Sequence, residues 1–254
     1  MKRIGLKILK GIGTFFLLAI IGFGILYLIY NEPLPKGKEG AEAQALLEQL
    51  NKAVNKEAWD KTRYLQWSFA GLGTHDYLWD RERHLVEVKY GDTRVLLNPS
   101  TKTGEVYENG VKVTEDASSS VETAYAYFTN DAFWLNAFVQ IEQPNIKLEA
   151  VDLEEENGKG LLVTYESGGV TPGDAYLWIF DENGLPKAWK MWVKIIPIGG
   201  VYSTWENWET LPTGAKVARS HSMGFLDTNI ENLRSFQTLE EGGMTEDVFA
   251  SISN

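Results

Sequence analysis

The chain has 254 residues, 44% of them hydrophobic, a composition that excludes intrinsic disorder and can supply a sizeable core. It contains no cysteine, which excludes disulfides, cysteine-based zinc sites, cysteine nucleophiles and acylation at an N-terminal cysteine. Residues 1–38 carry six basic residues and one acid, whereas the remainder carries 18 basic and 34 acidic residues. So acidic a domain repels the phosphate backbone, and no nucleic-acid partner is expected.

The first predicted element is a membrane-spanning helix. Residues 11–30 form an uncharged apolar run, and at ~1.5 Å per residue such a helix spans about 30 Å, the thickness of a bilayer core. Basic residues crowd the segment before the run, whereas acids and bases balance after it, so the positive-inside rule places the N-terminus in the cytoplasm. These basic residues are Lys2, Arg3, Lys7 and Lys10. The pattern predicts a single-pass membrane protein with its N-terminus in the cytoplasm and its domain on the extracytoplasmic side.

A cleaved signal peptide is the alternative interpretation of this run. Its apolar region normally covers ~7–15 residues and ends at a small-residue cleavage site. Here the nearest such triplet, Ala41-Glu42-Ala43, comes only after two prolines and two lysines. We therefore expect residues 1–38 to form a cytoplasmic tip, a retained anchor and a stiff linker, and residues 39–254 to form one extracytoplasmic β-rich domain. Its negative charge disfavours an anionic lipid surface, so bilayer contact is expected mainly from the anchor.

The predicted domain begins with a helix and three strands. Residues 41–58 carry an apolar stripe at helical spacing, which predicts a helix packed on a sheet. Residues 65–69 alternate apolar and polar side chains, as a half-buried strand does. A hairpin is predicted around Arg81-Glu82, and in its register Trp79 lies opposite His84, Tyr77 opposite Val86, and His75 opposite Val88.

The rest of the domain reads as more hairpins around one helical insertion. Asn-Gly pairs at 109–110, 157–158 and 183–184 favour tight turns that need positive φ. Ser119 and Glu122 are spaced as a capping box for a helix whose buried face is Val121, Ala124, Tyr125 and Phe128, and a short apolar stretch, 132–138, follows. Residues 240–254 read as a loose tail. The strand-like runs are 93–98, 104–109, 111–114, 147–154, 161–166, 174–181, 185–196, 201–209 and 215–223.

A long antiparallel sheet of this kind must curl or close. The predicted fold class is therefore α+β and mainly β: a curled antiparallel sheet, or half-barrel, with plugging helices, preceded by one transmembrane helix.

Motifs for catalysis and for metal or cofactor binding are missing. The three histidines form no His-Glu-x-x-His pair, Ser220-His221-Ser222 lacks the flanking glycines of a nucleophile elbow, and Gly71-Leu72-Gly73 is not a dinucleotide loop. We expect no enzyme activity, no cofactor and no metal. A hydrolase using a carboxylate pair stays open as an alternative, since Asp76, Asp80, Asp131 and Asp174 supply carboxylates.

Aromatic side chains are the most pronounced feature of the predicted strands. One interpretation is a core packed against the helices, and the other is an apolar lumen that holds an acyl chain. In the second interpretation the ligand-binding residues are Trp67, Phe69, Tyr77, Trp79, Trp134, Trp178 and Trp192.

Four local motifs, spread over about residues 60–220, resemble the lipoprotein-carrier superfamily typified by LolA and LolB, and within it an uncharacterised periplasmic family. They are Trp67-x-Phe69, His75-Asp76-Tyr77-x-Trp79-Asp80, Asn130-Asp131-x-Phe133-Trp134-Leu135 and Thr171-Pro172-Gly173-Asp174. The resemblance implies a half-barrel whose apolar lumen holds acyl chains. Carriers shuttle freely and LolB-like acceptors are lipoproteins, whereas this chain carries an anchor and no cysteine, so a fixed binding module fits better.

The sequence therefore predicts a membrane-anchored periplasmic domain that binds a membrane lipid or a lipoprotein acyl chain. The alternative is a non-catalytic accessory subunit that docks on a larger membrane protein complex. Complete filling of the concave side by the protein's own helices would count against the lumen.

Overall fold

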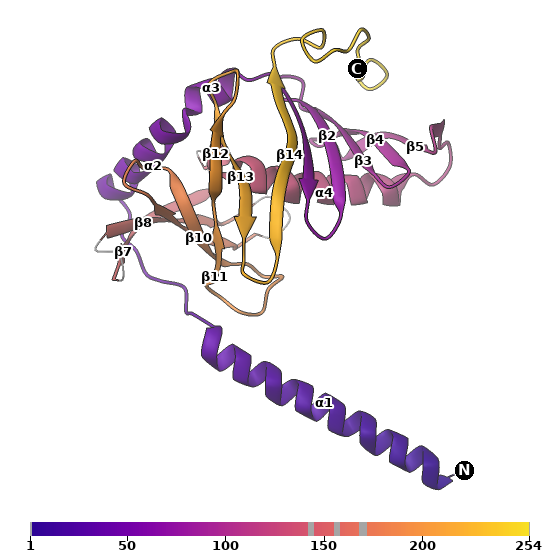
Figure 1. Ribbon diagram of the computed structural model, residues 1–254, viewed down its shortest axis with the longest axis vertical. Coiled ribbons are helices and arrows are strands. Elements are labelled where there is room, and N and C mark those ends of the chain that lie inside the picture. Colours follow the sequence, from indigo (N-terminus) through magenta and orange to yellow (C-terminus); the bar gives the residue numbers. More distant parts are fainter. Residues whose placement is uncertain (1, 142–144, 155–157, 168–171, 254) are drawn as a thin grey trace.

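The computed structural model describes residues 2–141, 145–154, 158–167 and 172–253, and within the first helix it describes side chains from Ile12 onward. The helices are α1 (Lys2–Tyr30), α2 (Ala41–Val54), α3 (Lys56–Lys61), α4 (Ser118–Asn136) and the 3-10 helix η1 (Ala137–Gln140). Two separate antiparallel sheets make up most of the domain, and α1 projects away from them (Figure 1).

The larger sheet has nine strands in the order β12-β13-β14-β1-β2-β3-β4-β5-β6. The first half of the chain supplies β1 (Tyr64–Ala70), β2 (Thr74–Asp80), β3 (Leu85–Tyr90), β4 (Thr93–Asn98), β5 (Thr103–Glu108) and β6 (Val111–Lys112). The C-terminal part supplies β12 (Glu206–Thr210), β13 (Lys216–Ser222) and β14 (Asp227–Phe236). The two halves join where β14 pairs with β1, so the last strand completes the sheet that the first one begins.

The smaller sheet has five strands in the order β11-β10-β9-β8-β7. They are β7 (Ile146–Leu153), β8 (Gly158–Tyr165), β9 (Ala175–Phe180), β10 (Pro186–Trp192) and β11 (Val201–Thr204). The chain passes between the sheets at Trp205, which separates β11 from β12. The predicted strand 201–209 is therefore wrong as one element, because its two parts belong to different sheets.

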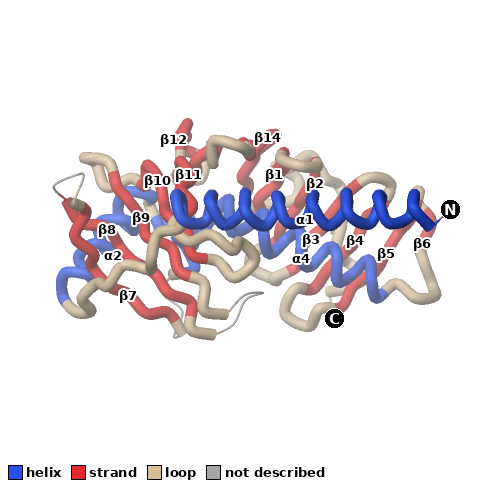
Figure 2. Tube along the Cα trace, turned by 90° about the horizontal axis from the view of Figure 1, so that it is seen from below, coloured by secondary structure: helices blue, strands red, loops and turns tan. Residues whose placement is uncertain are grey.

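The inner faces of both sheets bury one continuous apolar core around the helices. Residues of alternating position, such as Leu65, Trp67 and Phe69 of β1, point inward because successive strand side chains face opposite sides. Helix α4 packs against β3, β4, β5 and β13, while α2 packs against β7 and β8 (Figure 2). The predicted class is confirmed: the protein is mainly β, its curled antiparallel sheets are not closed, and helices fill the concave side.

Several local predictions were wrong. The helix predicted over 41–58 breaks at Asn55, which has φ 56 and separates α2 from α3. Helix α4 begins at Ser118 with Ala117 as its cap residue and no side-chain cap hydrogen bond, so the capping box does not form. This helix continues to Asn136 and absorbs most of the separate apolar stretch predicted at 132–138. The apolar face that Val121, Ala124 and Phe128 create is nonetheless buried as predicted.

The register of the β2–β3 hairpin differs from the prediction by two residues. Trp79 pairs with Val86 and Tyr77 pairs with Val88, because the turn takes four residues rather than two and His84 lies within it with φ 54. A slip of two keeps every side chain on its predicted face, whereas a slip of one would have inverted the hairpin.

The C-terminal residues form a cover, not a loose tail. Phe249 is fully buried against Tyr64, Leu78 and Leu96 on the outer face of the nine-stranded sheet. Arg83 holds the same segment through two hydrogen bonds to the Asp247 carboxylate, at 2.6 and 2.8 Å. The outer face of this sheet therefore carries a second, smaller core.

The segment after α1 is fastened to the five-stranded sheet at two points. The backbone N–H of Glu32 donates to Gly199 O at 3.0 Å, and Lys190 Nζ lies 2.7 Å from the Glu32 carboxylate. Lys38 then exchanges two backbone hydrogen bonds with Ala150 of β7, of 2.9 and 2.8 Å. The predicted linker is thus extended but not free, and we name residues 31–38 the linker clamp.

Candidate functional site

The candidate site is a group of aromatic side chains where the end of α4 crosses the gap between the two sheets. Alternation along β9 puts Tyr176 and Trp178 on its inner face, and pairing with β10 sets Trp189 beside Trp178. Helix α4 contributes Phe133 and Trp134, whose rings contact Trp189. We name the set the aromatic seam: Phe133, Trp134, Phe138, Tyr176, Trp178, Trp189 and Trp205.

The rings of the aromatic seam are in mutual contact. Trp189 lies at the centre, with ring centroids 4.9 Å from Trp178, 4.9 Å from Trp205 and 5.0 Å from Trp134. Most of these contacts are edge-to-face or tilted, the arrangements that aromatic pairs prefer. Phe133 and Trp134 remain half-buried, so this flank of α4 forms the accessible edge of the seam.

Polar hydrogens in the seam lack acceptors. Among the described residues, the indole N–H groups of Trp178, Trp189 and Trp205 are buried without a hydrogen-bond partner, as is the hydroxyl of Tyr165, whose ring contacts Tyr176. Leaving a buried donor unpaired costs roughly 1–3 kcal/mol. Three unpaired indole donors on neighbouring rings therefore favour the entry of an oxygen-bearing group.

His221 of β13 adds a titratable group to the seam. Its ring lies 4.4 Å from Trp205 and 5.2 Å from Trp134, and only 2% of the residue is exposed. Nδ1 lies 3.2 Å from Thr204 O, which makes Nδ1 the protonated nitrogen, while Nε2 has no partner. Burial lowers the pKa of His221 to about 4, against the opposing effect of the carbonyl groups of Thr204 and Trp134. The imidazole is thus neutral at pH 7.

A second polar cluster joins α4 to the nine-stranded sheet. The buried carboxylate of Asp131 accepts a hydrogen bond of 2.6 Å from the Tyr77 hydroxyl and lies 2.8 Å from His75 Nδ1. His75 also stacks on Tyr127 at 3.9 Å. Burial, assisted by the Asp131 charge, raises the pKa of Tyr77. Among the described residues no hydroxyl or thiol is hydrogen-bonded to His75, so the cluster has the form of a helix–sheet clasp.

The predicted lumen residues lie in three places. Trp67, Phe69 and Tyr77 are buried under α4, with Trp67 stacked on Tyr77 at 4.6 Å, and half-buried Trp79 packs beside them. Trp134 and Trp178 belong to the seam. Trp192 lies on the opposite face of the five-stranded sheet, where its indole donates to Glu32 O at 2.8 Å, so its assignment to the same lumen is corrected.

The structure also brings two distant sequence motifs together. His75 and Tyr77 of the first motif meet Asp131 of the second, although the two are far apart along the chain. Asp174 of the last motif accepts a hydrogen bond of 3.0 Å from the Lys194 backbone N–H, and Thr171 lies outside the described residues. His221 is considered in the sequence only within Ser220-His221-Ser222, and Trp205 is not singled out, because a single buried residue carries no periodic signal.

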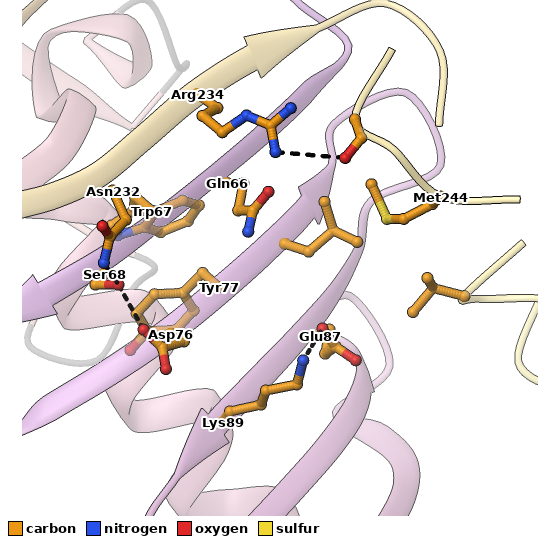
Figure 3. Close-up of a pocket in the computed structure, with 13 residues that line it drawn as sticks. Gln66, Trp67, Ser68, Asp76, Tyr77, Glu87, Lys89, Asn232, Arg234 and Met244 are labelled. Atoms are coloured by element: carbon orange, nitrogen blue, oxygen red, sulfur yellow. Dashed lines mark hydrogen bonds and ion pairs between the residues drawn. The ribbon is translucent and has the colours of Figure 1, made fainter. Parts of the chain in front are cut away.

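A surface pocket of about 510 Å³ opens on the outer face of the nine-stranded sheet (Figure 3). Its polar groups are mostly paired with each other: Ser68 Oγ donates to Asp76 at 2.5 Å, Asn232 donates to Ser68 at 3.0 Å, and Lys89 lies 2.9 Å from Glu87. Such internal pairing leaves few groups free to recognise a ligand, so the seam is the stronger candidate.

Metal-binding clusters of three or more His, Cys, Asp or Glu side chains are absent from the described residues. Within the same residues, Ile12–Tyr30 is the single helical segment long and apolar enough to cross a membrane, with a mean hydropathy of 2.5 and none of it buried.

The fold and the seam define an open antiparallel half-barrel filled by helices. The sequence matches no protein-family model and no curated protein. Among solved structures the chain is similar to a DUF1329 family protein from Desulfovibrio piger, with 10% identity and a TM-score of 0.39, over 76% of this chain and 92% of that one. It is also similar to a Vibrio parahaemolyticus domain named for outer membrane lipoprotein sorting, with 10% identity and a TM-score of 0.32, over 79% and 96%. The second name falls in the class that the sequence motifs resemble, but at TM-scores this low neither likeness carries a conclusion about binding.

Proposed function

We propose that the protein is a non-catalytic binding module, anchored by α1 in a bacterial inner membrane, whose periplasmic domain holds the acyl chain of a lipid or lipoprotein. Residues 1–38 form the cytoplasmic tip, anchor and linker, and residues 39–254 form the domain. The binding site is the aromatic seam together with the residues under α4.

The unpaired donors of the seam carry this proposal. An acyl chain brings an apolar tail that suits the rings and an ester or amide carbonyl that accepts hydrogen bonds. The indoles of Trp178, Trp189 and Trp205 offer N–H groups in an otherwise apolar surrounding. A ligand of this kind would contact the apolar rings with its chain and accept hydrogen bonds from the indole N–H groups with its carbonyl.

The side chains of the helices fill the concave side, which counts against a lumen that is already open in this state. Entry of a chain therefore requires α4 to move. The half-buried Phe133 and Trp134 mark the edge at which a ligand would first make contact. In this proposal α4 is a plug that exchanges its own contacts with Trp189 and Tyr176 for those of the ligand.

The position of this edge relative to the anchor also favours a membrane-derived ligand. Phe133 contacts Tyr165 and Tyr176, near the strand ends where Asp174 holds Lys194. The loop that contains Lys194 also contains Gly199, which is hydrogen-bonded to the residues following α1. The accessible edge therefore lies at the anchored end of the domain.

Native mass spectrometry of the full chain, gently extracted from its own membrane, tests the proposal. The expected result is a bound mass that matches a lipid or an acylated peptide. Trp178→Phe removes an unpaired indole N–H and should reduce the bound fraction, whereas Trp208→Phe removes one that already donates to Pro186 O at 2.9 Å and should not. Equal retention in both variants would contradict a role for the unpaired donors.

The alternative functions predict other outcomes of the same experiment. A stable protein partner without lipid would support an accessory subunit of a membrane complex. Hydrolysis of an acyl or glycosidic substrate that is lost in Asp131→Asn would support the hydrolase alternative, since Asp131 is the carboxylate paired with His75.

A further inference from the structure

Three hairpin tips at the anchored end of the domain expose apolar side chains. Ile195 in the β10–β11 loop is 75% exposed, Phe225 in the β13–β14 loop is 79% exposed, and Leu72 in the β1–β2 turn is 95% exposed. Hydrophobic residues scattered singly over a surface are ordinary, whereas several on the same end of a domain mark a contact surface.

Strand pairing places the Phe225 and Leu72 tips side by side. Ser222 pairs with Asp227 across the β13–β14 loop, and Asn229 pairs with Ala70 just before the β1–β2 turn. A methyl group on Gly71 would lie 3.2 Å from the Thr228 side chain, so the two tips are neighbours.

The Ile195 loop belongs to the same end. Thr204, near the end of β11, accepts a hydrogen bond of 2.9 Å from the backbone N–H of Ser222, which sets β11 alongside the β13–β14 loop. The loop that precedes β11 therefore lies at the end that carries Phe225, on the side from which α1 leaves the domain (Figure 1).

The anchor ends at this very loop. Asn31 follows the last residue of α1, and its side-chain oxygen accepts a hydrogen bond of 2.8 Å from the Gly199 backbone N–H. The backbone N–H of Glu32 donates in turn to Gly199 O at 3.0 Å. The next residue, Gly200, has φ 79 and lies so close to Glu32 that a Cβ on it would be 2.6 Å from the Glu32 side chain, so a glycine is needed there. If α1 spans a bilayer, its last residue lies at the lipid–water interface, and Gly199 and its loop lie there too.

We propose that Ile195 and Phe225, with Leu72 behind them, dip into the outer surface of the bilayer that α1 spans, so that the domain rests on the membrane with the aromatic seam next to lipid. The inference rests on the tether of the proposed function but not on its ligand. It extends the expectation that bilayer contact comes mainly from the anchor, because the added contact is apolar and does not require attraction between the acidic domain and lipid headgroups.

Site-directed spin labelling of the full chain in phosphatidylcholine vesicles tests this surface. The chain has no cysteine, so Ile195→Cys, Phe225→Cys and Leu72→Cys each give one labelling site. Ser100→Cys is the matched control, because Ser100 is exposed in the β4–β5 turn at the opposite end of the nine-stranded sheet. Vesicle flotation of each labelled protein checks the tether separately.

The expected result is that labels at 195 and 225 become more accessible to oxygen and less accessible to a water-soluble nickel chelate than the label at 100. In the double variant Ile195→Asp and Phe225→Asp, the label at 72 should shift toward the aqueous values while the protein still floats with the vesicles. Labels that stay as water-accessible as the control in a protein that floats would overturn the docking proposal but leave the tether intact. Labels shielded from both probes would also overturn it, because they would indicate a protein partner instead of lipid. Failure to float would refute the tether itself.

Discussion

Lowering the pH should destabilise the protein through His221. The imidazole is buried in the aromatic seam with its Nδ1–H directed at the Thr204 carbonyl and with Nε2 unpaired. Protonation would place a positive charge at Nε2, and within the part of the chain that the structure describes no carboxylate acts on this ring. The unfolded chain takes up the same proton in water without this penalty.

The size of the effect follows from the pKa of His221, which falls from 6.5 to about 4 on folding. One pKa unit corresponds to about 1.4 kcal/mol, so the neutral histidine contributes roughly 3 kcal/mol relative to the protonated one. A lowered pKa means that the unfolded state binds more protons between these two values. The contribution is therefore fully present above pH 6.5 and is lost as the pH falls to about 4.

Urea unfolding of the full chain in mild detergent, followed by tryptophan fluorescence from pH 7.5 to 4.5, measures this loss. Carboxylates also titrate in that range, so the useful quantity is the difference from His221→Gln, which cannot titrate. The free energy of unfolding of the wild type should fall more steeply than that of His221→Gln, while His84→Asn, in an exposed turn, should follow the wild type. Parallel curves for the wild type and His221→Gln would refute the reasoning.

Three further substitutions test the elements around the seam. Phe249→Ala should lower the free energy of unfolding by about 3–5 kcal/mol if the C-terminal cover unfolds with the sheet, and a smaller loss with new protease sensitivity confined to residues 238–253 would show that the cover detaches alone. Asp131→Asn keeps the shape of the side chain but removes the charge that Tyr77 and His75 contact. The free energy of unfolding in urea should fall by about 1–3 kcal/mol. An unchanged midpoint would show that the helix–sheet clasp does not stabilise the fold. Lys190→Met removes the ion pair with Glu32, so proteolysis within the linker clamp should accelerate without a change in the unfolding midpoint. Lys112→Met, which removes the ion pair with Glu105 in the other sheet, serves as the control.

Periodic signals explain why much of the fold was predictable. Strands β4 and β9 were predicted within one residue at each end, because alternating or continuous apolar runs lie between turn residues. Strand β14 was missed although it is the longest, since Asp227–Phe236 mixes acids, asparagines and one arginine with only a few apolar side chains. Residues 227–236 form a strand because they pair with β1 on one side and β13 on the other. Pairing with strands distant in the sequence leaves no local sequence pattern.

The candidate site was predictable in its composition but not in its layout. Strand alternation correctly put Trp67, Tyr77 and Trp178 on inner faces, yet assigned Trp192 to the same interior. Trp192 lies three residues after Trp189 on β10, and an odd spacing puts the two side chains on opposite faces of the sheet. Trp192 therefore faces the linker clamp. The sequence predicts one sheet, whereas the structure has two that meet at Trp205. The contact of His221 with Trp205 at this junction therefore could not be predicted.

The aromatic seam differs from an ordinary core in how poorly its polar atoms are satisfied. A core selected for stability alone would place phenylalanine or leucine where an indole N–H finds no acceptor, because each unpaired donor is a cost. Trp59, on α3, shows that this chain can satisfy a buried indole, since its N–H donates to Lys216 O at 2.9 Å. Among the described residues, three of the four buried indole N–H groups without a partner, those of Trp178, Trp189 and Trp205, lie in the aromatic seam, and the fourth, that of Trp67, lies under α4. A concentration of unpaired donors among neighbouring rings is the pattern expected where binding and not folding determines the residues.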